Sequence, residues 1–195
     1  MTDSERKRRF ELLALPQLDA AYNLARWLVS NDRDAEDVVQ DAYLRAYRYF
    51  DTYRGGDARS WMLSIVRRSA YDWLARNRSA NTVGLDVLEA EAVAAEEGMI
   101  AAPDDPETAA IRQADRRRLS VLIAALPEDF RAVVVLRDVE SLSYREIAQI
   151  CDIPLGTVMS RLARGRALLR RAWEAPLAKP MGSELPGRRE KTHGV

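Results

Sequence analysis

The chain has 195 residues, with 30 lysines and arginines against 30 aspartates and glutamates, so its formal net charge is zero. Its one cysteine, Cys151, excludes an intramolecular disulfide, and no apolar run approaches the roughly 20 residues of a membrane-spanning helix. The polar start, Asp3 to Arg9, is not a signal peptide, so we expect a protein of the reducing cytoplasm without membrane insertion. Because the chain has one histidine, His193, and one cysteine, it lacks the cluster of such residues that binds zinc, and we expect no zinc site and no cofactor.

The charges fall into blocks along the chain. Residues 1–80 carry 14 basic and 12 acidic side chains, residues 81–107 carry 8 acidic and no basic ones, and residues 108–173 carry 12 basic and 7 acidic ones. Glycines and prolines interrupt the acidic block and recur after residue 173. We therefore predict an all-α protein with two small helical domains, residues 10–80 and 108–173, joined by a flexible acidic linker at 81–107 and followed by a disordered tail at 174–195.

The first domain is predicted to begin with a helix over residues 16–30, followed by a second helix that Asp34 caps and that ends at Phe50. Valines and alanines at helical spacing form the inward face of this second helix. Its opposite face mixes charged residues with Leu44. An exposed leucine among charges indicates either an ordinary solvated face or a docking surface, and the spacing alone leaves both open.

A loop with the pair Gly55-Gly56 precedes a third helix, predicted over residues 59–78. Arginines alternate here with aromatic residues, a combination that suits unpaired DNA, because cations bind phosphates and flat rings stack on bases. The hydrophobic core accounts better for Trp61 and Trp73. Tyr53 and the glycine pair are therefore the better candidates for touching a base.

The second domain is predicted to start with a helix over residues 108–126, and Pro127 to start the next helix, in which residues 132–136 are buried. Four positions of the first of these helices are expected to face the core: Ile111, Leu119, Leu122 and Ile123.

The stretch from residue 142 to residue 171 has the pattern of a helix-turn-helix. Ser143 and Glu146 form a capping box that starts a short helix, and Pro154 ends the break after it and opens a second helix. Five arginines of that helix, with no acid between Leu155 and Trp173, favour a DNA-binding helix over a plain helical hairpin with a solvated face. The inward residues are Val158, Leu162 and Leu169, and the arginines are Arg161, Arg164, Arg166, Arg170 and Arg171.

Taken together, these segments resemble the extracytoplasmic-function sigma factors of bacterial RNA polymerase. The resemblance rests on residues 34–41, Trp61 with Arg67-Arg68, Leu126-Pro127, residues 144–148 and residues 153–164, and it covers about residues 10–173 in the family's order. It implies a specificity subunit that catalyses no reaction. The implied partners are core RNA polymerase (the clamp helices of its largest subunit and its flap), promoter DNA and an anti-sigma factor.

The resemblance also implies residue roles. The residues implied to bind core polymerase are Asp37, Gln40, Asp41, Leu44, Arg45 and Arg48. Those implied to open and read the minus-ten element are Tyr53, Arg54, Arg59, Trp61, Arg67, Arg68 and Tyr71. The residues implied to read the minus-thirty-five element are Arg145, Thr157, Met159, Ser160, Arg161, Ala163, Arg164 and Arg166. Of these, Met159, Ser160, Ala163 and Arg164 are expected nearest the base edges, and Arg145, Arg161 and Arg166 at phosphates.

Further hypotheses concern the remaining features. The acidic linker either keeps the chain in solution or imitates a nucleic-acid backbone in a polymerase channel built for RNA. Cys151 is better explained as a small core residue than as a redox sensor. A stand-alone helix-turn-helix regulator is the alternative function, but it leaves residues 34–41 without a role, and an enzyme lacks any recognisable catalytic motif. Without polymerase, we expect weak promoter binding.

Overall fold

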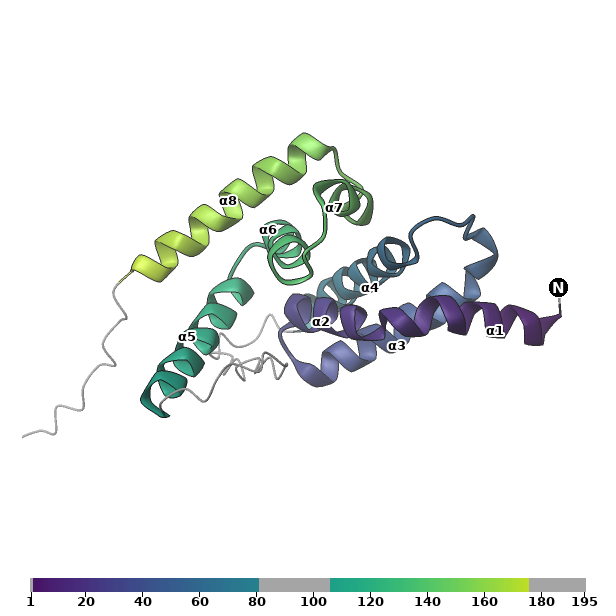
Figure 1. Ribbon diagram of the computed structural model, residues 1–195, viewed down its shortest axis with the longest axis horizontal. Coiled ribbons are helices and arrows are strands. Elements are labelled where there is room, and N and C mark those ends of the chain that lie inside the picture. Colours follow the sequence, from purple (N-terminus) through teal and green to yellow (C-terminus); the bar gives the residue numbers. More distant parts are fainter. Residues whose placement is uncertain (1, 81–105, 176–195) are drawn as a thin grey trace, which may run out of the picture.

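The computed structural model describes residues 2–80 and 106–175, and every regular element within these ranges is helical. The N-terminal module, residues 2–80, holds α1 (Asp3–Ala14), the 3-10 turn η1 (Leu15–Gln17), α2 (Leu18–Val29), α3 (Asp32–Arg48), the 3-10 turn η2 (Phe50–Thr52) and α4 (Ala58–Ala80). The C-terminal module, residues 106–175, holds α5 (Pro106–Ala124), α6 (Glu128–Val134), the π-helix η3 (Val135–Val139), α7 (Tyr144–Cys151) and α8 (Leu155–Glu174). Figure 1 shows the two modules side by side. The all-α prediction is confirmed for the described residues.

The predicted linker and tail lie outside the described residues, apart from the two linker residues that begin α5 and the two tail residues that follow Trp173. Among the described residues, no helix combines the length and the apolar composition that crossing a membrane requires.

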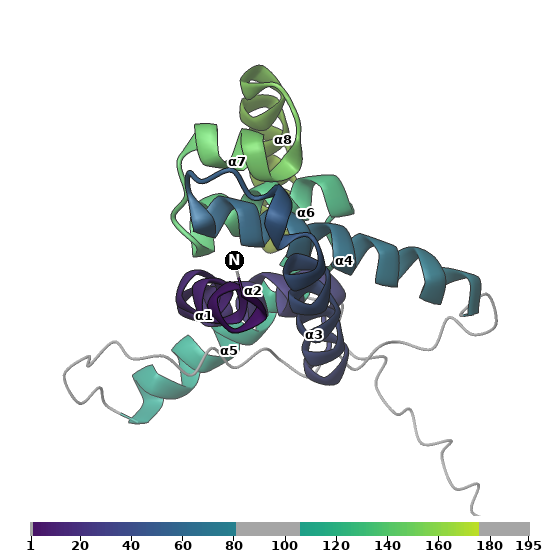
Figure 2. The same cartoon turned by 90° about the vertical axis from the view of Figure 1, so that its right-hand side faces the viewer.

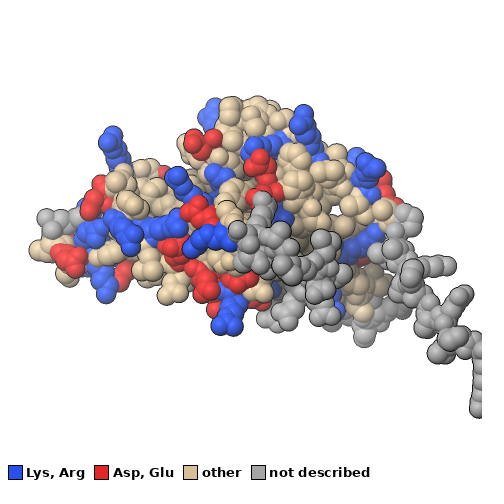
Figure 3. Space-filling view, turned by 180° about the vertical axis from the view of Figure 1, so that it is seen from behind, with Lys and Arg blue, Asp and Glu red and all other residues tan. Residues whose placement is uncertain are grey.

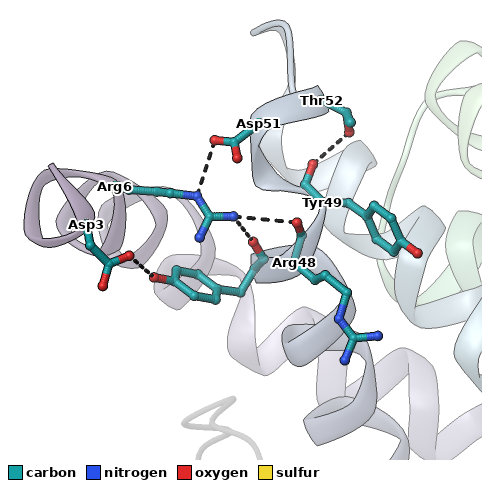
Figure 4. A network of polar contacts seen from close by, with 7 residues as sticks. Asp3, Arg6, Arg48, Tyr49, Asp51 and Thr52 are labelled. Atoms are coloured by element: carbon teal, nitrogen blue, oxygen red, sulfur yellow. Dashed lines mark hydrogen bonds and ion pairs between the residues drawn. The ribbon is translucent and has the colours of Figure 1, made fainter. Parts of the chain in front are cut away.

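Helix α1 begins before residue 10, the predicted start of the first domain. Thr2 and Glu5 cap it with a capping box, and Phe10 packs edge-on against Tyr47 at 5.2 Å between ring centroids. Arg6 fastens α1 to the end of α3 (Figure 4): its Nη2 donates to the carbonyl of Tyr47 at 2.7 Å, and its Nε pairs with Asp51 at 3.2 Å. Carbonyls in the last turn of a helix have no partner within the helix, so an arginine is well suited to bind them.

The predicted cap of α3 is wrong by three residues. Asn31 is the N-cap, its side-chain oxygen accepts from the backbone N–H of Asp34 at 3.1 Å, and α3 therefore begins at Asp32. The N–H of Asp34 is the donor that is capped, so its carboxylate cannot be the cap.

Helix α4 buries Met62, Leu63 and Val66 completely, whereas Trp61 and Trp73 are only half-buried. Both tryptophans nevertheless pack against core clusters, as the core interpretation predicted.

The prediction for α5 is partly wrong. Ile123 is buried, but Ile111 is 57% exposed and Leu119 also lies at the surface. The first turns of α5 project away from the module in Figure 1, and the described contact with α8 includes Arg118 near the helix end, which stacks on Trp173 at 4.7 Å. Helical spacing identified an apolar face there, but the described residues leave Ile111 and Leu119 exposed.

The helix-turn-helix is confirmed by α7 and α8. The capping box is present, with the Ser143 N–H donating to Glu146 at 2.7 Å, and Asp152 ends α7 in the left-handed conformation. Pro154 is the N-cap of α8 rather than its first residue, as Pro127 is the N-cap of α6. Buried Gly165 allows α8 to lie close to α6, because a Cβ at this position would sit 2.8 Å from Val134 Cγ2.

The two modules share one hydrophobic core, which the sequence did not indicate. A single cluster of buried residues continues from Leu24 and Leu28 of α2 through Val66 of α4 to Val133 of α6 and Ile147 of α7. Helix α7 lies against α4, and α8 lies on the outer side, away from α1 and α3 (Figure 2).

Candidate nucleic-acid interface

The residues predicted to bind polymerase share one face of α3. Leu44 is 61% exposed in the middle of this face, although it is a large apolar side chain. Arg45 bridges Asp41 at 2.8 Å and Asp72 of α4 at 2.5 Å, and the hydrogen bond to Asp72 raises its pKa. The other predicted positions, Asp37, Gln40 and Arg48, are exposed.

The predicted minus-ten residues begin in the loop between η2 and α4. Gly55 and Gly56 have φ angles of 90° and 102°, a region that favours glycine, and Tyr53 donates from its hydroxyl to the Gly56 carbonyl at 2.7 Å. The Tyr53 ring lies 4.9 Å from that of Trp61, while Arg54 is exposed.

These aromatic rings border a hollow of about 340 Å³, which the loop, the first turns of α4 and one residue of α7 line together. Asp57 fixes the start of α4 beside it by accepting from the N–H groups of Arg59 and Ser60 at 3.1 and 3.0 Å. The hydrogen bond with Ser60 is the main cause of the lowered pKa of the Asp57 carboxyl. The residue that α7 contributes to the lining is Gln149.

Three of the predicted minus-ten residues point at the C-terminal module. Arg59 pairs with Glu140 at 2.7 Å, Arg67 donates to the carbonyls of Ile150 and Cys151, and the Tyr71 hydroxyl donates to the carbonyl of Glu128 at 3.1 Å. Burial raises the pKa of Tyr71 to about 12. Arg68 is exposed and takes no part in these contacts.

The predicted minus-thirty-five residues lie mostly on the outer face of α8. Met159 is 47% exposed, and Ser160, Ala163 and Arg164 are exposed beside it. Thr157 is half-buried and accepts at its carbonyl from the Ser160 hydroxyl at 3.0 Å. The buried face of the same helix carries Val158 and Leu162, as predicted.

The arginines predicted to contact phosphates are not equivalent. Arg161 pairs with Asp129 at 2.8 Å and Arg166 pairs with Asp138, whereas Arg145 on α7 is exposed. The hydrogen bond to Asp138 is the main cause of the raised pKa of Arg166. Exposed ion pairs contribute about 0–1 kcal/mol, so a phosphate could replace either acid at small cost.

Sequence reasoning did not identify Arg137. Its Nη1 donates to the Leu142 carbonyl at 2.7 Å, and its guanidinium lies over the Tyr144 ring at 5.1 Å. With Arg145 it lines a hollow of about 400 Å³ beside the start of α8. Its position in the sequence, between the apolar run of residues 132–136 and Asp138, gave no sign of this.

Basic and acidic side chains are interspersed over the face shown in Figure 3 rather than separated into large patches. On this face, charge alone therefore does not mark a DNA-binding surface.

Comparison with protein families matches both modules. Residues 16–80 match the family described as Sigma-70 region 2, and residues 116–169 match the family described as Sigma-70, region 4. The first match covers α2 to α4, and the second covers the C-terminal half of α5 together with α6, α7 and most of α8.

Whole-chain comparison gives the same result. The chain is 36% identical over 163 residues to the ECF RNA polymerase sigma-E factor of Escherichia coli strain K12, covering 82% of this chain and 84% of that protein. It is 35% identical over 170 residues to the RNA polymerase sigma-H factor of Pseudomonas aeruginosa, covering 85% of this chain and 86% of the relative.

Two solved structures share the fold. The sigma factor RpoE from Bartonella quintana, crystallised with the anti-sigma factor NepR, has a TM-score of 0.65 and 25% identity, covering 85% of this chain and 97% of that one. CnrH, in complex with the cytosolic domain of CnrY, has a TM-score of 0.58 and 20% identity, covering 86% and 88% of the two chains.

Proposed function

Because this chain belongs to the extracytoplasmic-function sigma factors of bacterial RNA polymerase, we propose that its modules perform separate parts of promoter recognition. The chain binds core RNA polymerase and directs it to promoters. The N-terminal module docks on the polymerase and captures the opened minus-ten element. The C-terminal module reads the minus-thirty-five element in duplex DNA and docks on the flap. The chain catalyses no reaction, since bond formation belongs to the polymerase.

The outer face of α3 is the proposed docking surface for the clamp helices of the largest subunit. Its exposed centre, Leu44, supports this role, because protein interfaces place apolar side chains at the centre and charged ones at the rim. Arg45 is held in place by Asp41 and Asp72, so this part of the rim is ordered before the partner arrives.

The loop before α4 and the first turns of α4 form the proposed minus-ten reader. Moving a base out of the DNA stack costs a few kcal/mol of free energy. Stacking on aromatic side chains and contacts within a pocket must offset this cost. Tyr53, Trp61 and the hollow beside them supply rings and space, while Arg54, Arg59, Arg67 and Arg68 supply charge for the backbone.

Helix α8 is the proposed major-groove helix. Met159 and Ala163 offer apolar contact rather than hydrogen bonds, so thymine methyl groups or DNA shape would account for recognition at these positions. Ser160 and Arg164 can donate hydrogen bonds to base edges, and in this proposal Arg145, Arg161 and Arg166 contact phosphates.

Binding of both modules to one polymerase sets the spacing of the two promoter elements. Each module is small, and tethering raises affinity without any new contact. We further propose an anti-sigma partner, by likeness to the RpoE complex, and a cytoplasmic location, which follows from the family.

The observation that carries the proposal is the presence of both sigma regions in one chain. A stand-alone regulator would use the helix-turn-helix but has no use for residues 16–80.

Transcription in vitro with purified core polymerase on genomic fragments tests the proposal. We expect new start sites that core polymerase alone does not use, and stoichiometric co-purification of the chain with core polymerase. Identical start sites with and without the chain, or no co-purification, would contradict it.

A further inference from the structure

Helix α1 takes no part in the proposed functions of the N-terminal module, and it lies outside the match to Sigma-70 region 2, which begins at residue 16. Two of its side chains, Arg6 and Phe10, reach the end of α3 and the η2 turn. The chain passes from η2 directly into the loop of the proposed minus-ten reader. These two contacts therefore bear on how the reader is held.

Arg6 binds the junction between α3 and η2 with its guanidinium group (Figure 4). Its Nη2 donates to the Tyr47 carbonyl at 2.7 Å and to the Arg48 carbonyl at 3.5 Å, and its Nε pairs with Asp51 of η2 at 3.2 Å. Only 20% of the Arg6 side chain is exposed, and the guanidinium also lies 4.5 Å from the centroid of the Tyr47 ring. With these partners, Arg6 is placed to hold the turn rather than to bind a phosphate itself.

Phe10 supplies an apolar contact beside this polar one. Its ring packs edge-on against Phe50 of η2 at 5.4 Å between centroids, and both side chains are buried. Phe50 in turn lies nearly parallel to Tyr53, with 6.3 Å between centroids and 10° between ring planes, and it lies 6.3 Å from Trp61. Aromatic rings at these separations attract one another. A continuous row of rings thus joins α1 to the two rings that border the hollow.

The loop that carries Tyr53 is open around its two glycines. No atom lies within 4 Å of the place where a Cβ would stand on Gly55 or Gly56. The Tyr53 hydroxyl binds within the loop itself, at the Gly56 carbonyl. On the other side of Tyr53, η2 is a single turn, and one turn of helix has little stability of its own. The position of Tyr53 therefore depends on what holds η2.

We infer that Arg6 is a positioning residue of the minus-ten reader: with Phe10 it fixes η2, and through η2 it fixes the Tyr53 ring on which an unpaired base would stack. This inference rests on the proposed function, because it presumes that the ring receives a base. A ring that is in place before DNA arrives offsets more of the cost of unpairing a base than a mobile one. Arg6 touches no base and acts only through η2.

Positioning has a consequence that a general loss of folded protein lacks. On duplex promoter DNA, base capture must offset the cost of unpairing, whereas that cost is absent on a template whose minus-ten bases are already unpaired. A displaced Tyr53 should therefore impair initiation more on duplex DNA than on the unpaired template. A variant that only lowers the amount of folded chain would reduce both rates by the same factor. The ratio of the two initiation rates is therefore the readout.

Arg6→Ala tests this in the full-length chain, with core polymerase and a promoter found among the genomic fragments. Arg8→Ala is the matched control, because it removes the same charge from an exposed position of the same helix. We expect Arg6→Ala to reduce initiation on the duplex promoter about tenfold relative to Arg8→Ala, and by no more than about twofold when mismatches keep the minus-ten element unpaired. Binding to core polymerase should be equal. The same ratio of rates in both variants would overturn the inference.

Hydrogen exchange in the chain without polymerase tests the contact itself. Within η2, the backbone N–H groups of Thr52 and Tyr53 donate to carbonyls at 2.9 and 3.0 Å. In Arg6→Ala these two groups should exchange about fivefold faster than in Arg8→Ala, because η2 opens more often, while α2 should exchange alike in both variants. Unchanged exchange in η2 would also overturn the inference.

Two additions keep the test decisive. If circular dichroism shows that Arg6→Ala loses helicity, Asp51→Ala takes its place, because it breaks the same ion pair from a side chain that is 66% exposed. A ratio of rates equal to that of the unaltered chain would then overturn the inference. If the unaltered chain fails to direct initiation but exchange in η2 still differs between Arg6→Ala and Arg8→Ala, the proposed function fails while the hold of α1 on η2 stands.

Discussion

Two faces of this molecule are predicted to read DNA, and they differ in whether the structure exposes them. The outer face of α8, with Met159 and Arg164, is exposed, whereas the face of α4 with Arg59 and Arg67 lies against the other module. The exposure of the α8 face follows from the local fold of a helix-turn-helix, because helical spacing decides which side of α8 is buried. The exposure of the α4 face depends on contacts between residues more than eighty positions apart in the sequence. Exposure of a predicted site is thus a property of the conformation, and not of the sequence pattern.

The largest effect is expected from a substitution on the exposed face of α3. Leu44→Asp should weaken core polymerase binding by about 100-fold, because a charge at the centre of an interface loses apolar burial and stays unpaired. Pull-down titration with core polymerase measures this. Leu12→Asp, at an exposed leucine of α1 away from this face, is the control and should bind normally. Equal losses in both variants would remove the special role of α3.

The exposed face of α8 should respond to a single arginine. Arg164→Ala is expected to reduce promoter-specific initiation about tenfold, since an arginine contact to a base edge is worth roughly 1–3 kcal/mol. Arg170→Ala, on an exposed position of the same helix outside the predicted set, is the control. Initiation rates in vitro at fixed salt check this. An unchanged rate for Arg164→Ala would show that this face does not read the promoter.

The placement of α8 itself can be tested with its two glycines. Gly165→Ala should destabilise the fold by about 1–2 kcal/mol, because the added Cβ meets buried Val134. Gly156→Ala should stabilise by up to about 1 kcal/mol, because the space around Gly156 is open and alanine favours a helix. Thermal unfolding of both variants gives the two signs. The same sign for both would contradict the close approach of α6 and α8.

The covered face of α4 should be sensitive to high pH, which is the smallest expected effect. Burial raises the pKa of Tyr71 from 10.0 to about 12, so the protonated hydroxyl is favoured in the fold. The stability that the protonated Tyr71 hydroxyl contributes to the fold is fully present below pH 10 and is lost as the pH rises towards 12. Tyr71→Phe should remove this part of the loss, and at neutral pH it should cost about 1 kcal/mol for the hydrogen bond to Glu128. Unfolding by urea at pH 8 and at pH 11 measures the difference. An identical pH dependence with and without the hydroxyl would exclude this role.

The parts of the fold that the sequence predicted are those fixed by local chemistry. Ser143 and Glu146 form their capping box within one turn, and Val158 and Leu162 are buried because their spacing matches a helix face. Helix α1 was missed because its run of basic residues hides its apolar positions. The spacing of Thr2 and Glu5, which is that of a capping box, was the available signal.

The contacts between modules could not be predicted in the same way. Arg67 binds backbone carbonyls, which every residue has, so no side-chain pattern marks its partner. Glu140 reads in the sequence as one acid among mixed charges, and only the fold buries it opposite Arg59. The candidate residues were therefore identifiable from sequence, while their state in the chain without polymerase was not.

The central claim, that the conformation decides whether the α4 face is exposed, is tested most directly by a distance between the modules. Thr52 and Gln149 line the same hollow from opposite modules, so spin labels on Thr52→Cys and Gln149→Cys, in a chain with Cys151→Ala, report whether they touch. We predict one short distance in the chain alone, replaced by a long one when core polymerase is added. A distance that is long from the start, or one that stays short in the holoenzyme, would contradict the account.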